Sequence, residues 1–183
     1  MSAHPPYPRA RLAGLFYLIT FVTGTIALFV RGNVGMVAGM IAGVSYVAVT
    51  LLFYGLFKPV SRGLSLLAAI VSLVGCAVGP LGRLHLVPFK ISPLVFFGVY
   101  CLLIGYLILR STFLPGALGG LMAFGGLGWL IFLAPSLATQ LSPYLYFPGM
   151  IGEGVLTVWL LVAGVNVTRW QEQAVATGAS RPT

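Results

Sequence analysis

Six long apolar stretches, separated by short segments that carry most of the basic residues, constrain this chain of 183 residues more than any other feature. Each stretch is close to the ~20 residues that an α-helix needs to cross about 30 Å of hydrocarbon. They lie at residues 12–30, 34–57, 63–81, 93–109, 117–134 and 148–167. Because 59% of the residues are hydrophobic and 7% are charged, a water-soluble fold would expose large apolar patches. The sequence therefore predicts an all-α polytopic transmembrane bundle of about six helices.

Little sequence remains outside the predicted spans. The tails, residues 1–11 and 170–183, are too short to bury a core of their own, so we expect one integral membrane domain over residues 1–183. The first span follows Arg9 and Arg11, as a signal peptide would. It is long enough to cross a bilayer, lacks a small-residue cleavage site and stops at Arg31, so we interpret it as an uncleaved anchor.

Basic residues are divided unequally between the two sides of the predicted membrane. The side that holds both tails carries seven of them, and the opposite side carries three. The seven are Arg9, Arg11, Lys58, Arg62, Arg110, Arg169 and Arg181, and the three are Arg31, Arg83 and Lys90. Cytoplasmic loops are enriched in Lys and Arg, so we expect both termini in the cytoplasm.

The formal net charge of +8 does not indicate a nucleic-acid partner. The charges are spread one or two to a loop, without the basic face that nucleic-acid binding needs. They read instead as topology signals and contacts with lipid headgroups, so the lipid bilayer is the predicted partner.

The residues that carry metal or nucleophilic chemistry are sparse. Cys76 and Cys101 fall in different spans without a Cys-x-x-Cys spacing, and the histidines are His4 and His85. This set assembles no zinc or haem constellation, and we expect no metal and no cofactor. The cysteines are expected to be small packing residues, with a redox role as the alternative. There is no nucleophile elbow, phosphate loop or HExxH pair, which argues against an enzyme.

Glycines recur at helical spacing in three predicted spans, and those of the fifth are Gly116 and Gly120, followed by Gly125, Gly126 and Gly128. Gly35, Gly39 and Gly43 repeat every fourth residue in the second span, and Gly75 and Gly79 do so in the third. Lipid supplies no hydrophobic drive between helices, so small residues that allow close backbone contact take its place. We expect these glycines to mark helix packing, with a homodimer interface as the alternative.

Glu153 is the acidic residue that lies inside an apolar stretch. The other acidic residue, Glu172, lies in the polar tail, and the chain has no Asp. An ionisable group at membrane depth is costly and usually has a structural or functional role. Gly149, Glu153 and Thr157 share one stripe of the sixth span, which predicts that the carboxyl points into the bundle.

Two arginines of the predicted outer side are candidate partners for this carboxyl. Glu153 lies five residues beyond Pro148, about 8 Å below the outer boundary of the hydrocarbon, which an arginine side chain can reach. We expect an outward-facing polar pocket among the first, third and sixth helices, with Glu153 paired to Arg31 or Arg83. The other candidate members of the pocket are His85, Thr157, Tyr17, Tyr46 and Tyr100.

Two interpretations of this pocket compete. In the first, the ion pair fixes the sixth helix, and the chain is a structural or accessory bundle, or a subunit of a larger membrane assembly. In the second, the same charges bind or transport a small molecule, a lipid or an ion. Other membrane subunits or a second copy of the chain are the candidate protein partners under the first interpretation.

Motifs along nearly the whole chain carry a further signal. They are residues 11–15, 58–62 and 96–98, the Arg-Ser-x-Phe-Leu-Pro run at residues 110–115, and Gly-Glu at residues 152–153. Together they closely resemble a family of bacterial membrane proteins grouped as domain of unknown function 4386. The resemblance implies a bundle of six or seven helices, of unknown activity, in the bacterial cytoplasmic (inner) membrane.

The chain departs from the family pattern at three places. The segment at residues 31–34 is shorter than the resemblance implies. Val71 and Ser72 stand where the family tends to place an arginine within the membrane, and Tyr100 stands where a histidine is usual. If those polar groups form the family's site, this chain has lost part of it while keeping Glu153.

Overall fold

The computed structural model describes residues 6–83, 86, 92–142 and 144–178, without the side chains of residues 6, 7 and 83. All regular structure in these ranges is helical. The long helices are α1 (Pro6–Phe29), α2 (Asn33–Phe57), α3 (Arg62–Arg83), α4 (Pro93–Arg110), α5 (Gly116–Leu130) and α7 (Tyr146–Val162). The shorter elements are the 3-10 helix η1 (Ile131–Leu133), α6 (Pro135–Leu141) and α8 (Val167–Ala176).

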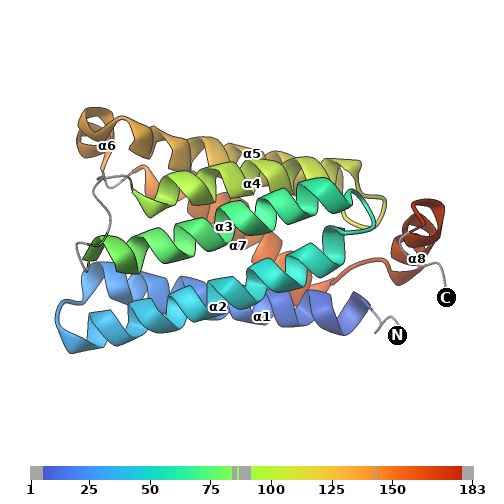
Figure 1. Ribbon diagram of the computed structural model, residues 1–183, viewed down its shortest axis with the longest axis horizontal. Coiled ribbons are helices and arrows are strands. Elements are labelled where there is room, and N and C mark those ends of the chain that lie inside the picture. Colours follow the sequence, from blue (N-terminus) through green and yellow to red (C-terminus); the bar gives the residue numbers. More distant parts are fainter. Residues whose placement is uncertain (1–5, 84–85, 87–91, 143, 179–183) are drawn as a thin grey trace.

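The long helices form a closed ring (Figure 1). Each one packs against the next along the chain from α1 to α5, and α7 packs against both α5 and α1. Because α7 completes the ring, side chains from all six helices can meet in one interior.

The prediction of an all-α transmembrane bundle is confirmed. Five helices are long and apolar enough to cross a membrane, and a sixth crossing is counted if α6 and α7 form one bent span. Large apolar side chains cover the outside of the ring, including Phe29, Val44 and Val162, which are 80%, 72% and 72% exposed. A surface of this kind is suited to lipid rather than to water.

The predicted sixth span is too long at its end. Residues 148–167 were expected to be helical, but α7 ends at Val162 because Gly164 adopts φ 67°, a left-handed conformation that favours glycine. The Gly164 N–H closes the helix on the Trp159 carbonyl at 3.0 Å. Asn166 then caps α8, since its side chain accepts the Arg169 N–H at 3.1 Å. Part of the predicted C-terminal tail is therefore a helix.

The predicted N-terminal tail is shorter than expected. It was predicted to cover residues 1–11, but α1 begins at Pro6 and includes Arg9 and Arg11. Proline is tolerated in the first turn of a helix, where its missing N–H has no partner to lose.

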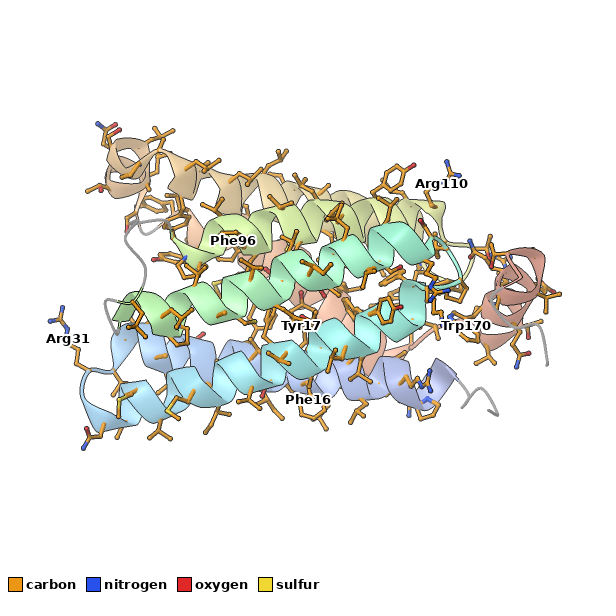
Figure 2. The ribbon with its side chains drawn as sticks, viewed as in Figure 1. Phe16, Tyr17, Arg31, Phe96, Arg110 and Trp170 are labelled. Atoms are coloured by element: carbon orange, nitrogen blue, oxygen red, sulfur yellow. The ribbon has the colours of Figure 1, made fainter. Side chains whose placement is uncertain are left out.

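Both termini lie at the same end of the ring (Figure 1). The loops after α2 and α4 are also at this end, and α8 packs beside them. The Trp170 indole of α8 is buried and donates to the Leu56 carbonyl of α2 at 2.8 Å. Figure 2 shows Arg110 at this end and Arg31 at the opposite end. The cytoplasmic location of the terminal end stays a prediction from the charge distribution.

Close backbone contacts occur on both sides of α5. A Cβ atom added to Gly105 of α4 would lie 2.7 Å from the Gly119 carbonyl oxygen, and the reverse distance is also 2.7 Å. Gly98 and Gly126 form a second reciprocal contact between the same two helices. On the other side, Gly152 of α7 lies against the backbone of α5. Only residues without a side chain permit this approach.

The glycine stripe predicted on α2 packs differently. No neighbouring atom lies within 4 Å of a Cβ placed on Gly43, and Gly35 contacts the carbonyl of Val30 in the preceding turn. Gly39 is half-buried. Within this chain Gly43 therefore makes no close helix contact, contrary to the expectation. Gly75 and Gly79 of α3 do face α4.

Candidate functional site

The Glu153 side chain lies inside the ring, near the middle of α7, and is 5% exposed. Its Oε1 accepts a hydrogen bond from the Trp129 indole Nε1–H at 2.7 Å. Its Oε2 accepts a longer hydrogen bond from the Tyr46 hydroxyl at 3.4 Å. The predicted inward direction of the Gly149, Glu153 and Thr157 stripe is thus observed, because all three residues are buried.

Local sequence on α7 makes room for the indole. Gly149 lies one turn before Glu153, and any Cβ at this position would overlap the Trp129 ring. The absent side chain therefore lets Trp129 lie flat against α7 and reach the carboxyl. The Thr157 hydroxyl donates a hydrogen bond to the Glu153 backbone carbonyl at 2.8 Å, so its hydrogen bond goes to the helix backbone and not to the carboxyl.

Three tyrosines and a cysteine surround the same carboxyl. Tyr17 of α1 and Cys101 of α4 lie beside Glu153, and Tyr100 of α4 lies within electrostatic range of it. The Tyr46 ring contacts the Tyr17 ring edge-on at a centroid distance of 5.7 Å and the Tyr100 ring at 5.8 Å. Figure 2 shows Tyr17 in the interior of the ring.

A second polar contact lies one turn further along α2. The hydroxyls of Thr50 and Ser72 are 2.6 Å apart, and Thr50 also donates to the Tyr46 carbonyl at 2.9 Å. Ser72 is fully buried, and Tyr100 lies next to Thr50. This contact joins α3 to the group around Glu153.

We call this group the polar centre, and each of the six long helices contributes to it. Its members are Tyr17, Tyr46, Thr50, Ser72, Tyr100, Cys101, Trp129, Glu153 and Thr157. All of them are buried. The ring therefore encloses a polar interior within an apolar exterior.

Two hydroxyls of the polar centre have no hydrogen-bond partner among the described residues. They belong to Tyr17 and Tyr100, whose side chains are 0% and 1% exposed. Buried polar groups are paired in the great majority of cases, so an unpaired hydroxyl calls for a specific explanation. The two hydroxyls come from different helices: that of Tyr17 lies beside the Glu153 carboxyl, and that of Tyr100 lies beside Thr50.

The predicted ion pair with Arg31 is not formed. Arg31 is exposed on the turn between α1 and α2, at the end of the ring (Figure 2). Glu153 lies about 10 Å along α7 from its first residue, Tyr146. Over the described side chains, Glu153 makes its hydrogen bonds with neutral donors and forms no ion pair.

The other predicted members of the pocket have different outcomes. Tyr100 and Thr157 belong to the polar centre. The Arg83 side chain and the whole of His85 lie outside the described residues, so a pairing of Arg83 with Glu153 stays a prediction. Ser72 and Tyr100, where the family resemblance implies an arginine and a histidine, both belong to the polar centre.

Trp129 is the hydrogen-bond donor to the carboxyl that the sequence did not predict. It falls in the glycine-rich fifth span, where nothing in the apolar pattern distinguishes it from a lipid-facing residue. Its signal lies in Gly149, which is on another helix and 20 residues away. Cys101 was predicted as a packing residue, and the structure places it both in the core and beside the carboxyl.

The described residues contain no group of three or more His, Cys, Asp or Glu side chains that could hold a metal ion. The polar centre instead offers one carboxyl, several phenolic and aliphatic hydroxyls, a thiol and an indole N–H. Chemically, such a set can bind and release a proton, or hold a small cation against the carboxyl.

A closed ring of apolar helices around a buried carboxyl defines a polytopic membrane bundle with a polar interior. Residues 83–164, which run from the end of α3 to the end of α7 and include Glu153, match the family described as Domain of unknown function (DUF4386). The predicted resemblance to this family is confirmed over that range.

A curated relative carries the similarity further. An uncharacterised protein of the archaeon Archaeoglobus fulgidus is 28% identical over 127 residues, which is 64% of this chain and 76% of the relative. The similarity therefore extends beyond bacteria. No solved structure matches the chain.

Proposed function

We propose that this protein is an integral membrane bundle that binds a small cationic ligand, in the simplest case a proton, at Glu153. The observation that carries the proposal is that the described side chains around the carboxyl are neutral. A glutamine could accept the Trp129 N–H on its carbonyl oxygen and donate its amide N–H to the Tyr46 hydroxyl, so it would fill the same place without putting an ionisable group in hydrocarbon. What a carboxyl adds is the ability to take up a proton or to balance a cation.

The site stabilises Glu153 in each of its two protonation states, for different reasons. The Trp129 N–H and the Tyr46 O–H stabilise the anion, because hydrogen bonds to a charged acceptor are about twice as strong as neutral ones. The protonated form avoids the cost of a charge in a buried site. Proton binding can thus change the charge of the polar centre while its helices stay in place.

Infrared titration of the protein in lipid tests this function. The chain has two acidic side chains, Glu153 and Glu172, so the carboxyl bands can be assigned by substitution. We expect a pH-dependent band of a protonated carboxyl that is lost in Glu153→Gln and kept in Glu172→Gln, the exposed control. A Glu153 that keeps one protonation state across the stable pH range of the fold would refute the proposal.

A structural or accessory role is the second candidate, and a specific observation favours it. Gly43 of α2 and Gly120 of α5 face open space, so each leaves a place where a helix of another subunit can approach closely. This role would be supported if helix cross-links to another membrane protein form in native membranes from cysteines placed at these glycines. It predicts that Glu153→Gln lowers thermal stability without altering any ligand or proton uptake.

The location that goes with both candidates is the cytoplasmic membrane of the host cell, with the termini in the cytoplasm. The excess of basic residues at the terminal end supports this proposal.

A further inference from the structure

We propose that the ligand of the polar centre is a small protonated amine, a cation with N–H donors of the ammonium type. The inference rests on the proposed function, in which Glu153 binds a cation, and it names the chemical class of that cation. It is carried by two hydroxyls of the polar centre that have no hydrogen-bond partner among the described residues, that of Tyr17 beside the carboxyl and that of Tyr100 beside Thr50.

The acceptor atoms of the polar centre suit a ligand with several N–H donors. A carboxylate has about four acceptor sites, and Trp129 and Tyr46 use one on each oxygen. The unpaired hydroxyls of Tyr17 and Tyr100 add two further acceptors. The polar centre thus holds hydroxyl acceptors without a partner on α1 and α4, whereas its Thr50 and Ser72 hydroxyls are already bonded to each other. An ammonium group has N–H donors for several acceptors at once.

Aromatic rings lie around these acceptors. Tyr46 lies at their middle, in contact with Tyr17, Tyr100 and Phe97, whose ring centroid is 4.6 Å from its own. Aromatic faces attract cations, and the attraction is larger where water is excluded. A cation among these rings is therefore stabilised by both the carboxylate and the ring faces.

The polar centre fits an amine better than it fits an anion, calcium or magnesium. An anion would meet the Glu153 carboxylate and find no basic side chain hydrogen-bonded to it among the described residues. Calcium takes six to eight oxygen ligands, and magnesium needs a near-ideal octahedral set that usually includes waters. A single carboxylate with phenolic hydroxyls and aromatic rings fits an ammonium group better than either metal.

An amine has to enter a packed interior to reach the polar centre. The Tyr17 and Tyr100 side chains can turn without breaking a side-chain hydrogen bond, since their hydroxyls have none among the described residues. The Tyr46 hydroxyl has one at 3.4 Å, which is long for an O–H donor. Because all three rings belong to the packed core, the site can admit a small amine but not a bulky one.

Equilibrium binding of labelled methylammonium to the full chain in lipid nanodiscs tests the inference. We expect saturable binding that is lost in Glu153→Gln and is weakened about tenfold by Tyr17→Phe or Tyr100→Phe, because each removes one acceptor from a charged donor. Tyr106→Phe, at a 48% exposed position of α4, is the matched control and should bind normally. Thermal melting of every variant verifies that the fold is kept.

Competition identifies the feature that is recognised. Tetramethylammonium carries the same charge but has no N–H donor, so it should not displace methylammonium. Displacement at equal concentration would overturn the donor-based inference, as would the absence of saturable methylammonium binding while the Glu153 carboxyl still titrates in the infrared. If the carboxyl neither binds methylammonium nor titrates, the proposed function fails as well.

Discussion

The hydrogen bond between Trp129 and Glu153 gives a buried carboxyl the partner that it needs. A carboxyl inside a membrane bundle needs partners, and Arg31 and Arg83 were the predicted ones. An indole N–H and a phenolic O–H supply them instead. Residue types predict that a buried carboxyl will be paired, but they do not predict which residue of a neighbouring helix will reach it, since this depends on the rotation of each helix.

Loss of the indole donor should weaken the fold measurably. We expect Trp129→Phe to lower the free energy of unfolding by about 2 kcal/mol, since it leaves a buried acceptor oxygen without its shortest bond. Trp159→Phe, at a 38% exposed position of α7, should change stability by less than about 0.5 kcal/mol. Denaturant unfolding in mixed micelles gives both values, and equal losses would contradict the assigned bond.

Helix α5 shows how glycine position matters at the scale of an element. Its glycines look alike in the sequence, but Gly126 meets the backbone of α4, whereas Gly120 meets nothing within 4 Å. The repeat predicts that close helix contacts exist, and it cannot say which glycines form them. This is why a close contact was expected at Gly43 of α2, which has none, as well as on α5, where Gly126 makes one.

Matched alanine substitutions on α5 test this distinction. Gly126→Ala should destabilise the bundle by about 1–3 kcal/mol, because the new methyl group would lie 2.7 Å from the Gly98 carbonyl oxygen. Gly120→Ala should be neutral, or stabilising by up to about 1 kcal/mol, through the better helix propensity of alanine. Melting temperatures in detergent compare the two, and an equal response of both variants would refute the contact.

Helix α8 is a second element whose attachment can be measured. It is held to α2 by Trp170 and to the loop after α4 by Gln173, which accepts the Thr112 N–H at 3.1 Å. Trp170→Phe should release α8 and speed proteolytic cleavage near residues 163–166 severalfold, while Val175→Ala, at a 72% exposed position, should not. Unchanged cleavage in Trp170→Phe would show that α8 is held by other contacts.

The whole molecule was predictable in outline because lipid sets the length of each span. Predicted spans and observed helices agree closely where basic residues bound them, as at Arg62 and Arg110. They disagree where a glycine in a left-handed conformation ends the helix, as at Gly164. The closure of α7 on α1 follows from tertiary packing, and no local pattern encodes it.

Topology reporters test the orientation at this scale. A fluorescent protein fused after residue 183 should fluoresce, because the positive-inside rule places that end in the cytoplasm. Alkaline phosphatase fused after Gly32, in the turn on the opposite side, should be active. A C-terminal fluorescent protein that stays dark, together with an alkaline phosphatase that is active when fused at the C-terminus, would show that the bundle has the opposite orientation.

The emission of Trp129 as a function of pH is the measurement that tests the polar centre most directly, since this residue donates to the carboxyl proposed to bind the proton. It is made on a chain with Trp159→Phe and Trp170→Phe, so that Trp129 is the fluorophore, with the fold verified by melting. We predict that the emission of Trp129 follows the infrared titration of Glu153 and becomes independent of pH in Glu153→Gln. An emission that ignores pH while the fold and the carboxyl titration persist would contradict the polar centre described here.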